Sequence, residues 1–377
     1  MTPRGPLNVL LASLATVGIQ ALMLSPLVPD IAAGLATGAK EVGFGAGAYG
    51  GGVALAALLA APRLGRWPKR TAIRLAFAVL AAALLVCGLA GDWRVFAAGQ
   101  FVVGLASGVI IPATYALTAD IADPADRAQA TGRVLFGCSV AMVAGVPLAS
   151  LLSAAIGWRG TYMAVAAIAL VMVAGGSFLP RGAIAASGAA GGPFRVLRIP
   201  GAALGYGATF AYMIGFYQTY TFIGDHVRTL HGKGAWLGGA ISLAYGLGFG
   251  AGIVLDRWID AKGPRRLMPL GLFLVGLNYL VLPLAALSAP AVALYPVLWG
   301  LANHFCMTCL VSFIGTLSAE ERGALMGFFS FVTYVALGLG GALYGPVYDT
   351  FGFAAASLAA TLTLWSAAVA ALPRKVP

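Results

Sequence analysis

Charged side chains are scarce in this sequence, making up 9% of its 377 residues, against about a quarter in an average soluble domain. Hydrophobic residues make up 60%. Such a chain has too little polar surface to cover a water-soluble globule. This scarcity excludes an ordinary soluble protein and predicts an integral membrane protein whose partner is the lipid bilayer.

Acidic residues are absent from the middle of the long apolar runs, because all twelve Asp and Glu lie between the runs or at their ends. An acid inside the bilayer usually marks a proton or ion path. The chain therefore lacks the midplane carboxylate that a proton-driven carrier normally needs. The remaining titratable candidates are His304 inside one run, and Asp225 and His226 at the end of another.

Several other signatures are missing. There is no phosphate-binding loop of the form G-x-x-x-x-G-K-S/T, so this chain carries no ATP-hydrolysing motif. No nucleophile–base–orienter set appears, so we expect no enzyme activity and no cofactor. The four cysteines lie inside apolar runs, which argues against a disulfide framework. The net charge of +11 comes from basic residues in short gaps between runs, which argues against nucleic acid.

Twelve apolar runs are each about long enough to span a bilayer. Eighteen of the 23 Lys and Arg lie in one set of gaps and five in the other. The positive-inside rule then places both termini in the cytoplasm of a multi-pass protein. The runs are 6–29, 42–61, 71–91, 94–118, 131–156, 160–180, 199–224, 234–255, 267–287, 290–316, 324–347 and 352–372.

The two halves of the chain repeat each other at a constant offset of 195 residues. This indicates a duplication, with one six-helix bundle over 1–180, a linker over 181–198 and a second bundle over 199–377. The matched pairs are Asp30 with Asp225, Asp126 with Glu321, and Gly157 with Gly352.

Three motifs carry a family resemblance. A basic turn with Arg63, Gly65 and Arg66 fits the loop pattern G-x-L-A-D-R-x-G-R-R, with Pro62 at the Asp position. A second copy keeps Asp260, Gly263, Arg265 and Arg266, and Gly145-Val146-Pro147 precedes Gly157-Trp158-Arg159. The chain thus resembles the major facilitator superfamily, in particular the drug:proton antiporter branch with its sugar-efflux and arabinose-efflux permease-like members.

The resemblance implies an all-α membrane protein with twelve helices in two pseudo-symmetric six-helix bundles. It also implies a monomer in the bacterial inner membrane that exports a small, drug- or sugar-like solute by alternating access, with protons as the coupling ion. One departure is Gln100, at a position where the family often carries a coupling Arg. Candidate coupling and gating residues are Asp225, His226, Arg257, Asp260, Arg265, Gly145 and Pro147, and Asp260 is expected to cap or bridge a neighbouring helix end.

In this family the first, fourth, seventh and tenth helices line the central path. Polar residues in those helices, with one from the eleventh, are therefore the candidate substrate-binding residues. They are Gln20, Tyr115, Tyr217, Thr221, Asn303, His304 and Tyr334. Aromatic residues of the seventh helix have a second interpretation as an interfacial belt. The glycines from Gly45 to Gly52 are expected to form a helix-packing surface.

Two other functions remain open. Imidazole, thiol and thioether groups are ligands for soft ions, so His304, Cys306, Met307 and Cys309 allow an importer of copper or another soft metal. These residues have alternative interpretations as packing residues, or as a proton relay for His304. A function of another class is a non-transporting membrane sensor or assembly partner, although no soluble domain is present to support it.

Overall fold

The computed structural model describes residues 4–59, 67–123, 127–181, 193–232, 236–318 and 320–372, and these residues form helices without a β-strand. The first half contains α1 (Arg4–Leu22), α2 (Leu24–Gly34), α3 (Ala39–Leu59), α5 (Lys69–Leu89), α6 (Trp93–Ile121), α7 (Arg127–Val140), the π-helical turn η1 (Ala141–Gly145), α8 (Val146–Gly175) and η2 (Gly176–Phe178). The second half contains η3 (Pro193–Arg198), α9 (Ala202–His231), α10 (Trp236–Ala251), η4 (Gly252–Leu255), α11 (Asp256–Lys262), α12 (Pro264–Ala285), α13 (Ala289–Leu294), α14 (Pro296–Thr316) and α15 (Arg322–Ala370).

Two glycines divide the longest helical segments. Gly157 in α8 has φ of 76° and Gly352 in α15 has φ of 78°, a backbone conformation that side chains other than glycine's rarely tolerate. Each therefore ends one membrane helix and begins the next. Nine helical segments of the described chain are long and apolar enough to span a membrane, and two of them contain these glycines. Counting those two twice and adding the more polar α9 gives the twelve spans predicted from the sequence.

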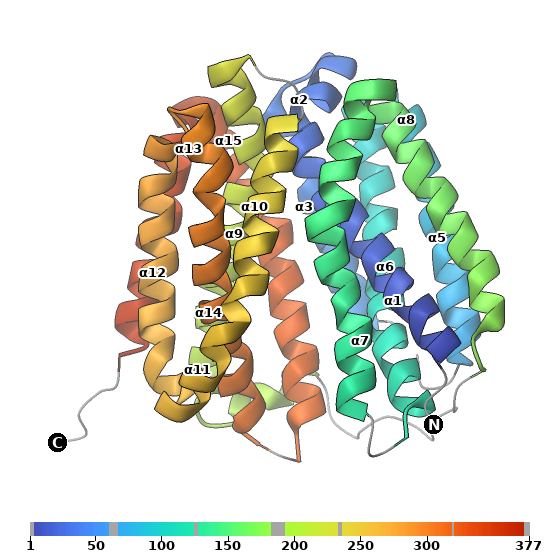
Figure 1. Ribbon diagram of the computed structural model, residues 1–377, viewed down its shortest axis with the longest axis vertical. Helices are drawn as coiled ribbons and strands as arrows, with labels where there is room; N and C mark the ends of the chain where they lie inside the picture. The colour runs from blue at the N-terminus through green and yellow to red at the C-terminus, as the bar shows by residue number, and fades with distance from the viewer. Residues whose placement is uncertain are drawn as a thin grey trace.

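The helices form two bundles, with the first half on the right of Figure 1 and the second half on the left. Each bundle has its own buried hydrophobic core. One core draws almost entirely on residues 7–179, and the other on residues 196–371. Most of the predicted linker, residues 182–192, lies outside the described residues, so its exact boundaries stay a prediction.

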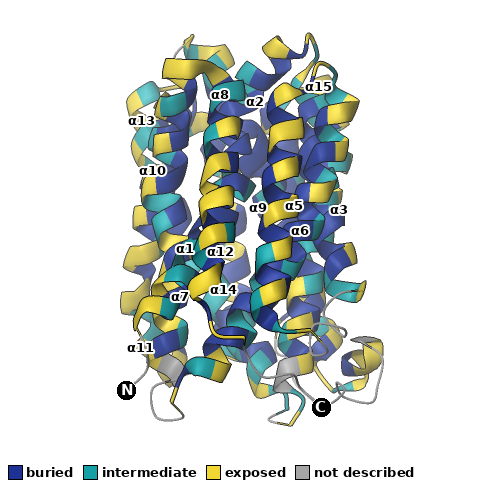
Figure 2. Cartoon of the chain, turned by 90° about the vertical axis from the view of Figure 1, so that its right-hand side faces the viewer, coloured by how far each residue is buried: buried dark blue, intermediate teal, exposed yellow. Residues whose placement is uncertain are grey.

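The outer faces of the bundles are apolar rather than charged. Exposed positions run along the outward sides of the helices, while buried positions face inward (Figure 2). Large hydrophobic side chains occupy many of the exposed positions, which suits contact with lipid rather than water. Examples are Leu75, Leu151, Val171, Phe273 and Leu362.

The bundles contact each other near one end of the molecule. We call the end where α1 begins and α15 ends the terminal end, and the end that carries α2 the far end (Figure 1). In the far half, the backbones of α3 and α15 approach closely. A Cβ atom added at Gly50 would lie 2.4 Å from the Gly338 nitrogen, and one at Gly47 would lie 2.9 Å from the Gly338 oxygen. These glycines form the α3–α15 seam, and the predicted packing role of this stretch agrees with their position.

The seam yields a test with a neighbouring control. We expect Gly50→Val to force α3 and α15 apart and to destabilise the protein by about 1–3 kcal/mol, as overpacked interiors do. Gly51→Val adds the same side chain at a position with no atom within 4 Å. Thermal unfolding in detergent should therefore show a lower midpoint for Gly50→Val alone. Equal midpoints for the two variants would show that the seam tolerates separation.

Candidate functional site

A small cavity of about 20 Å³ lies between the bundles and is lined by residues from α1, α2, α3, α6, α9 and α15. We call it the upper cavity, because it is the nearer of two central cavities to the far end. Gln20 donates a hydrogen bond from Nε2 to Ser107 Oγ over 3.3 Å. The other amide atom, Gln20 Oε1, is buried without a hydrogen-bond partner among the described residues. The Tyr49 hydroxyl lies beside both residues but makes no hydrogen bond of ordinary geometry with the described residues. The cavity thus presents polar groups that are not fully satisfied.

A larger lower cavity of about 250 Å³ lies between α3, α6 and α15. Val53 and Tyr334 line it, and they lie one helical turn from Tyr49 and Leu337 of the upper cavity. The two cavities are therefore stacked along the same helices. Four aromatic side chains line the lower cavity, namely Tyr115, Phe328, Phe331 and Tyr334.

Five of the seven predicted path residues line these cavities. Gln20, Tyr217 and Thr221 line the upper one, and Tyr115 and Tyr334 line the lower one. The Thr221 hydroxyl donates to the Tyr217 carbonyl oxygen over 2.6 Å, so its proton is used within α9. Sequence reasoning overlooked Tyr49. Its isolation as the one polar side chain in the glycine-rich middle of a helix was the available signal.

Asn303, another predicted path residue, lies in the interior of the second bundle instead. It is fully buried, and its Nδ2 donates to the Trp299 carbonyl oxygen over 2.8 Å. The backbone carbonyl oxygen of Asn303 accepts a hydrogen bond from the Tyr212 hydroxyl over 3.3 Å. Asn303 is absent from the described linings of both cavities.

His304, the seventh predicted path residue, pairs with an acid. Its Nε2 lies 2.9 Å from Asp256 Oδ1, and its ring meets Phe249 edge-on at 5.1 Å between centroids. A Cβ atom at Gly252 would lie 2.4 Å from the ring, so the glycine makes room for the imidazole. Gly252 is the first residue of η4, which leads into Asp256 at the start of α11. The local backbone thus forms a His–Asp pair in the second bundle.

The two cysteines proposed as soft-metal ligands are core residues, and Cys306 packs on a different helix from His304. Cys306 packs against Gly271 of α12, whereas His304 packs against α10 and η4. Both Cys306 and Cys309 are fully buried in the core. A group of three or more His, Cys, Asp or Glu suited to a metal is not found in the described part of the chain. The geometry therefore gives the metal alternative no support from these four residues.

Two ion pairs connect the bundles at the far end. Arg228 Nη1 of α9 lies 2.5 Å from Asp30 Oδ1 of α2, as an ion-pair contact rather than a hydrogen bond of ordinary geometry. Ser153 Oγ also donates to Asp30 Oδ2 over 3.3 Å. Lys40 Nζ of α3 lies 3.8 Å from Asp349 Oδ2 of α15. Arg228 and Lys40 were counted from the sequence among the basic residues that set the topology, but Asp30 and Asp349 were not identified as their partners.

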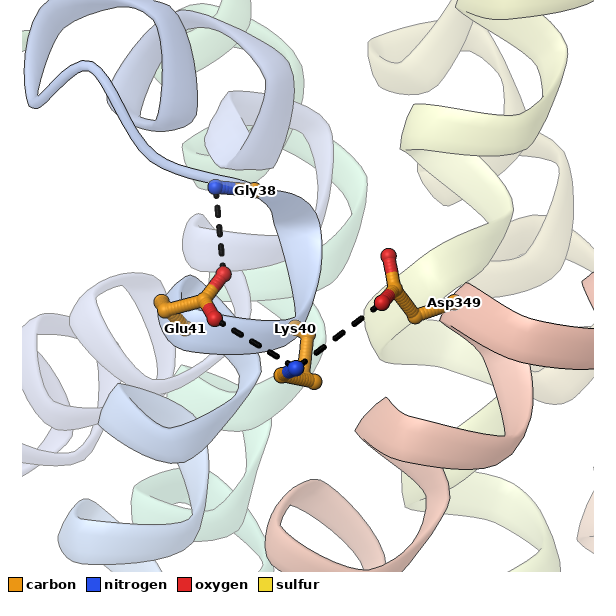
Figure 3. Close-up of polar contacts among 4 residues, drawn as sticks. All are labelled: Gly38, Lys40, Glu41 and Asp349. Atoms are coloured by element: carbon orange, nitrogen blue, oxygen red, sulfur yellow. Dashed lines mark hydrogen bonds and ion pairs between the residues drawn. The ribbon is translucent and has the colours of Figure 1, made fainter.

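The Lys40 site is anchored within its own helix end (Figure 3). Glu41 Oε1 lies 3.6 Å from Lys40 Nζ, and Glu41 Oε2 accepts a hydrogen bond from the Gly38 backbone nitrogen over 3.1 Å. A glutamate in the first turn that reaches back in this way is a common N-terminal cap. The cap fixes the start of α3 and thereby positions Lys40 toward Asp349.

Asp225 and His226 lie just beyond the predicted span and line an open far-end pocket of about 450 Å³. The Tyr348 hydroxyl donates to Asp225 Oδ2 over 2.5 Å. Burial raises the pKa of the Asp225 carboxyl, although the Tyr348 hydrogen bond and the Arg228 charge act in the opposite direction. Burial, followed by the charge of His231, lowers the pKa of His226, whose ring stacks on Phe353 at 4.6 Å. Both residues therefore contact partners of their own bundle and line a pocket whose other wall comes from α2 and the start of α3.

Gly145 and Pro147 lie at a wide helical turn. Pro147 has no N–H to donate, and the π-helical η1 ends at Gly145, two residues before it. A Cβ atom at Gly145 would lie 2.2 Å from Ile19 Cγ1 of α1, so the glycine permits close contact there. The Pro147 Cα lies against Gly239 of α10, in the other bundle. This turn therefore packs between its own bundle and the opposite one.

The second basic turn lies at the terminal end. Arg265 Nη1 donates to the Ala371 carbonyl oxygen over 2.5 Å and lies over the Phe313 ring, so it caps the end of α15. Arg257 and Asp260 are exposed, and Asp260 makes no ion pair or hydrogen bond with any described residue. The bridge expected of Asp260 is thus made by Arg265. Arg63, Gly65 and Arg66 of the first turn lie outside the described residues.

Gln100 is held by a neighbouring helix. Its Nε2 donates to the Tyr162 hydroxyl of α8 over 2.8 Å, and the side chain is buried. The residue that stands where the family often has a coupling arginine is therefore an uncharged contact within the first bundle.

Comparison with known proteins finds relatives that align with most of this chain. The chain is 28% identical over 349 residues to the uncharacterized MFS-type transporter YwfA of Bacillus subtilis, covering 90% of this chain and 85% of that protein. It is 32% identical over 287 residues to a chloramphenicol resistance protein of Streptomyces lividans, covering 72% and 71%. It is 26% identical over 372 residues to the transcription regulatory protein OpdE of Pseudomonas aeruginosa, covering 97% and 92%.

Solved structures share the fold. The crystal structure of the nucleoside transporter NupG aligns with a TM-score of 0.81 at 13% identity, over 97% of this chain and 98% of that one. A likeness at this identity concerns the fold alone. The sequence model of the Major Facilitator Superfamily matches residues 10–341, which is most of the chain. With its two helical bundles and the cavities between them, the chain belongs to the Major Facilitator Superfamily and is a multi-pass membrane transporter rather than an enzyme.

Proposed function

We propose that the chain exports a small organic solute from the cytoplasm by alternating access, in exchange for protons. The observation that carries this proposal is the asymmetry of the path. The α3–α15 seam and two ion pairs join the bundles at the far end, whereas the 250 Å³ cavity lies between them toward the terminal end. Such a state loads its solute from the terminal side.

The orientation follows from charge. Eighteen of the 23 Lys and Arg lie in gaps that belong to the terminal end, and the positive-inside rule assigns that end to the cytoplasm. The arrangement described above would then be an inward-facing state. The relative named for chloramphenicol resistance supports export of a drug-like solute.

The far-end carboxyl supports the direction of proton coupling. Because burial raises the pKa of Asp225 in this closed state, the closed state binds the proton more tightly than a state that exposes Asp225 to water. Protonation from outside therefore favours far-end closure, and higher external pH favours opening. An exporter driven by external protons needs this direction of coupling, because proton uptake from outside must favour the return to the state with the far end closed.

Transport in proteoliposomes tests the proposal. We expect an imposed proton gradient to drive chloramphenicol against its concentration gradient, out of the compartment that faces the terminal end. The drive should disappear when an ionophore collapses the gradient. Transport that ignores the proton gradient would contradict the coupling, and an absence of transport for every organic solute tried would contradict export itself.

The His304–Asp256 pair, which lies within the second bundle rather than on the cavity walls, is the candidate proton carrier. Imidazole is a common proton-transfer group in proteins, and this side chain keeps an exposure of 14%. We expect His304→Gln to abolish gradient-driven transport while leaving solute-for-solute exchange in place, because glutamine can still hydrogen-bond to Asp256 but cannot titrate.

The matched control is His231→Gln, which removes a histidine that contacts the Ala286 carbonyl oxygen at the far end. This control should keep gradient-driven transport. If both variants transport as the unmodified chain does, His304 carries no coupled proton.

A second candidate function is regulatory, because OpdE is named as a transcription regulatory protein and aligns over 97% of this chain. A sensor of this kind would bind solute in the same cavities without moving it. Solute binding together with an absence of counterflow in proteoliposomes would favour this alternative.

A further inference from the structure

The two central cavities lack charge. None of the described residues that line either cavity is an Asp, Glu, Lys, Arg or His. A charged solute would give up its hydration there without meeting an opposite charge. From the cost of charges in membrane interiors, the loss of affinity is on the order of a hundredfold.

The upper cavity nevertheless presents hydrogen-bonding groups. Gln20 is 1% exposed and Tyr49 is 4% exposed. Gln20 Oε1 has no hydrogen-bond partner in the described chain, and the Tyr49 hydroxyl lies beside Gln20 and Ser107 without a hydrogen bond of ordinary geometry. Buried polar atoms in native proteins are nearly always paired. Gln20 Oε1 can accept from a hydroxyl or amide N–H, and the Tyr49 hydroxyl can donate to an oxygen.

Aromatic rings supply the rest of the surface. Tyr334 lines the lower cavity and lies near Tyr115 of the same cavity and near Tyr49 and Tyr217 of the upper one. Flat rings pack well against another ring, in stacked or edge-on arrangements. Tyrosine faces also attract cations, but that attraction offsets only part of the desolvation cost of a charge.

We propose that these cavities select an uncharged aromatic solute with hydroxyl or amide groups. Gln20 and Tyr49 bind the polar groups in the upper cavity. Tyr217 of the upper cavity and Tyr115 and Tyr334 of the lower cavity contact the ring. This inference rests on the proposed transport function for its physiological meaning and names the substrate class of that same site. It assigns a binding role to Tyr49, which was not among the candidate residues predicted from the sequence.

Binding of three related probes tests the selectivity. Chloramphenicol is uncharged, its deacylated amine is a cation at neutral pH, and its succinate ester is an anion. Titration calorimetry on the detergent-purified full chain should give the tightest binding for chloramphenicol. Both charged probes should bind on the order of a hundredfold more weakly. Equal or tighter binding of the amine or the ester, or no binding of any probe, overturns the proposal.

Two variants test the polar groups. Tyr49→Phe should weaken chloramphenicol binding about two- to tenfold, the usual effect of losing one neutral hydrogen bond. Tyr212→Phe removes a hydroxyl that contacts Asn303 away from both cavities and should bind normally. Gln20→Glu should shift the preference toward the amine cation. Equal affinities for Tyr49→Phe and Tyr212→Phe, or an unchanged probe ranking in Gln20→Glu, would contradict the assignment.

Calorimetry and transport separate the two claims. Selective binding of chloramphenicol without transport leaves this inference in place and removes the exporter proposal. Gradient-driven export of the amine cation in preference to chloramphenicol keeps the exporter proposal and overturns the selectivity for an uncharged solute.

Discussion

The close approach of the α3 and α15 backbones is the constraint on which the rest of the structure depends. At Gly47, Gly50, Gly338 and Gly341 the α3 and α15 backbones approach each other without a side chain of these four residues between them. The ion pairs Asp30–Arg228 and Lys40–Asp349 lie beyond the seam and are partly exposed. Pairs of this kind contribute only about 0.2–1 kcal/mol each, so packing closes the far end and the charges adjust the balance.

The seam also determines where the binding site can be. Where the helices meet through glycine, only the 20 Å³ cavity remains beside Tyr49, and space opens one turn further along, beside Val53 and Tyr334. Titratable groups are kept away from this space: Asp225 lies in the far-end pocket, and His304 lies beside α10 within the second bundle. An uncharged site between two separate titratable clusters allows proton binding to act through the closure of the bundles rather than through contact with the solute.

The sequence was enough to predict the helices, the family fold and several residues that line the cavities, but not the contacts between bundles. Apolar runs and glycine breaks report on single helices, so the twelve spans and the equivalence of Gly157 and Gly352 were visible. Which helix face points to the opposite bundle depends on packing, so Gln20 and Tyr217 line the upper cavity while Asn303 lies in a core. Tyr49, and the pairing of Lys40 with Asp349, depend on the relative position of α3 and α15, which no local pattern encodes.

Distances between the bundles at both ends, measured by double electron–electron resonance, test alternating access most directly. One spin-label pair at Ala36 and Thr350 would report on the far end, and another at Trp67 and Lys262 on the terminal end, all at exposed positions. As the pH on the far side rises, the account predicts that the far-end distance lengthens while the terminal-end distance shortens. Distances that stay fixed at both ends, or that lengthen together, would contradict it.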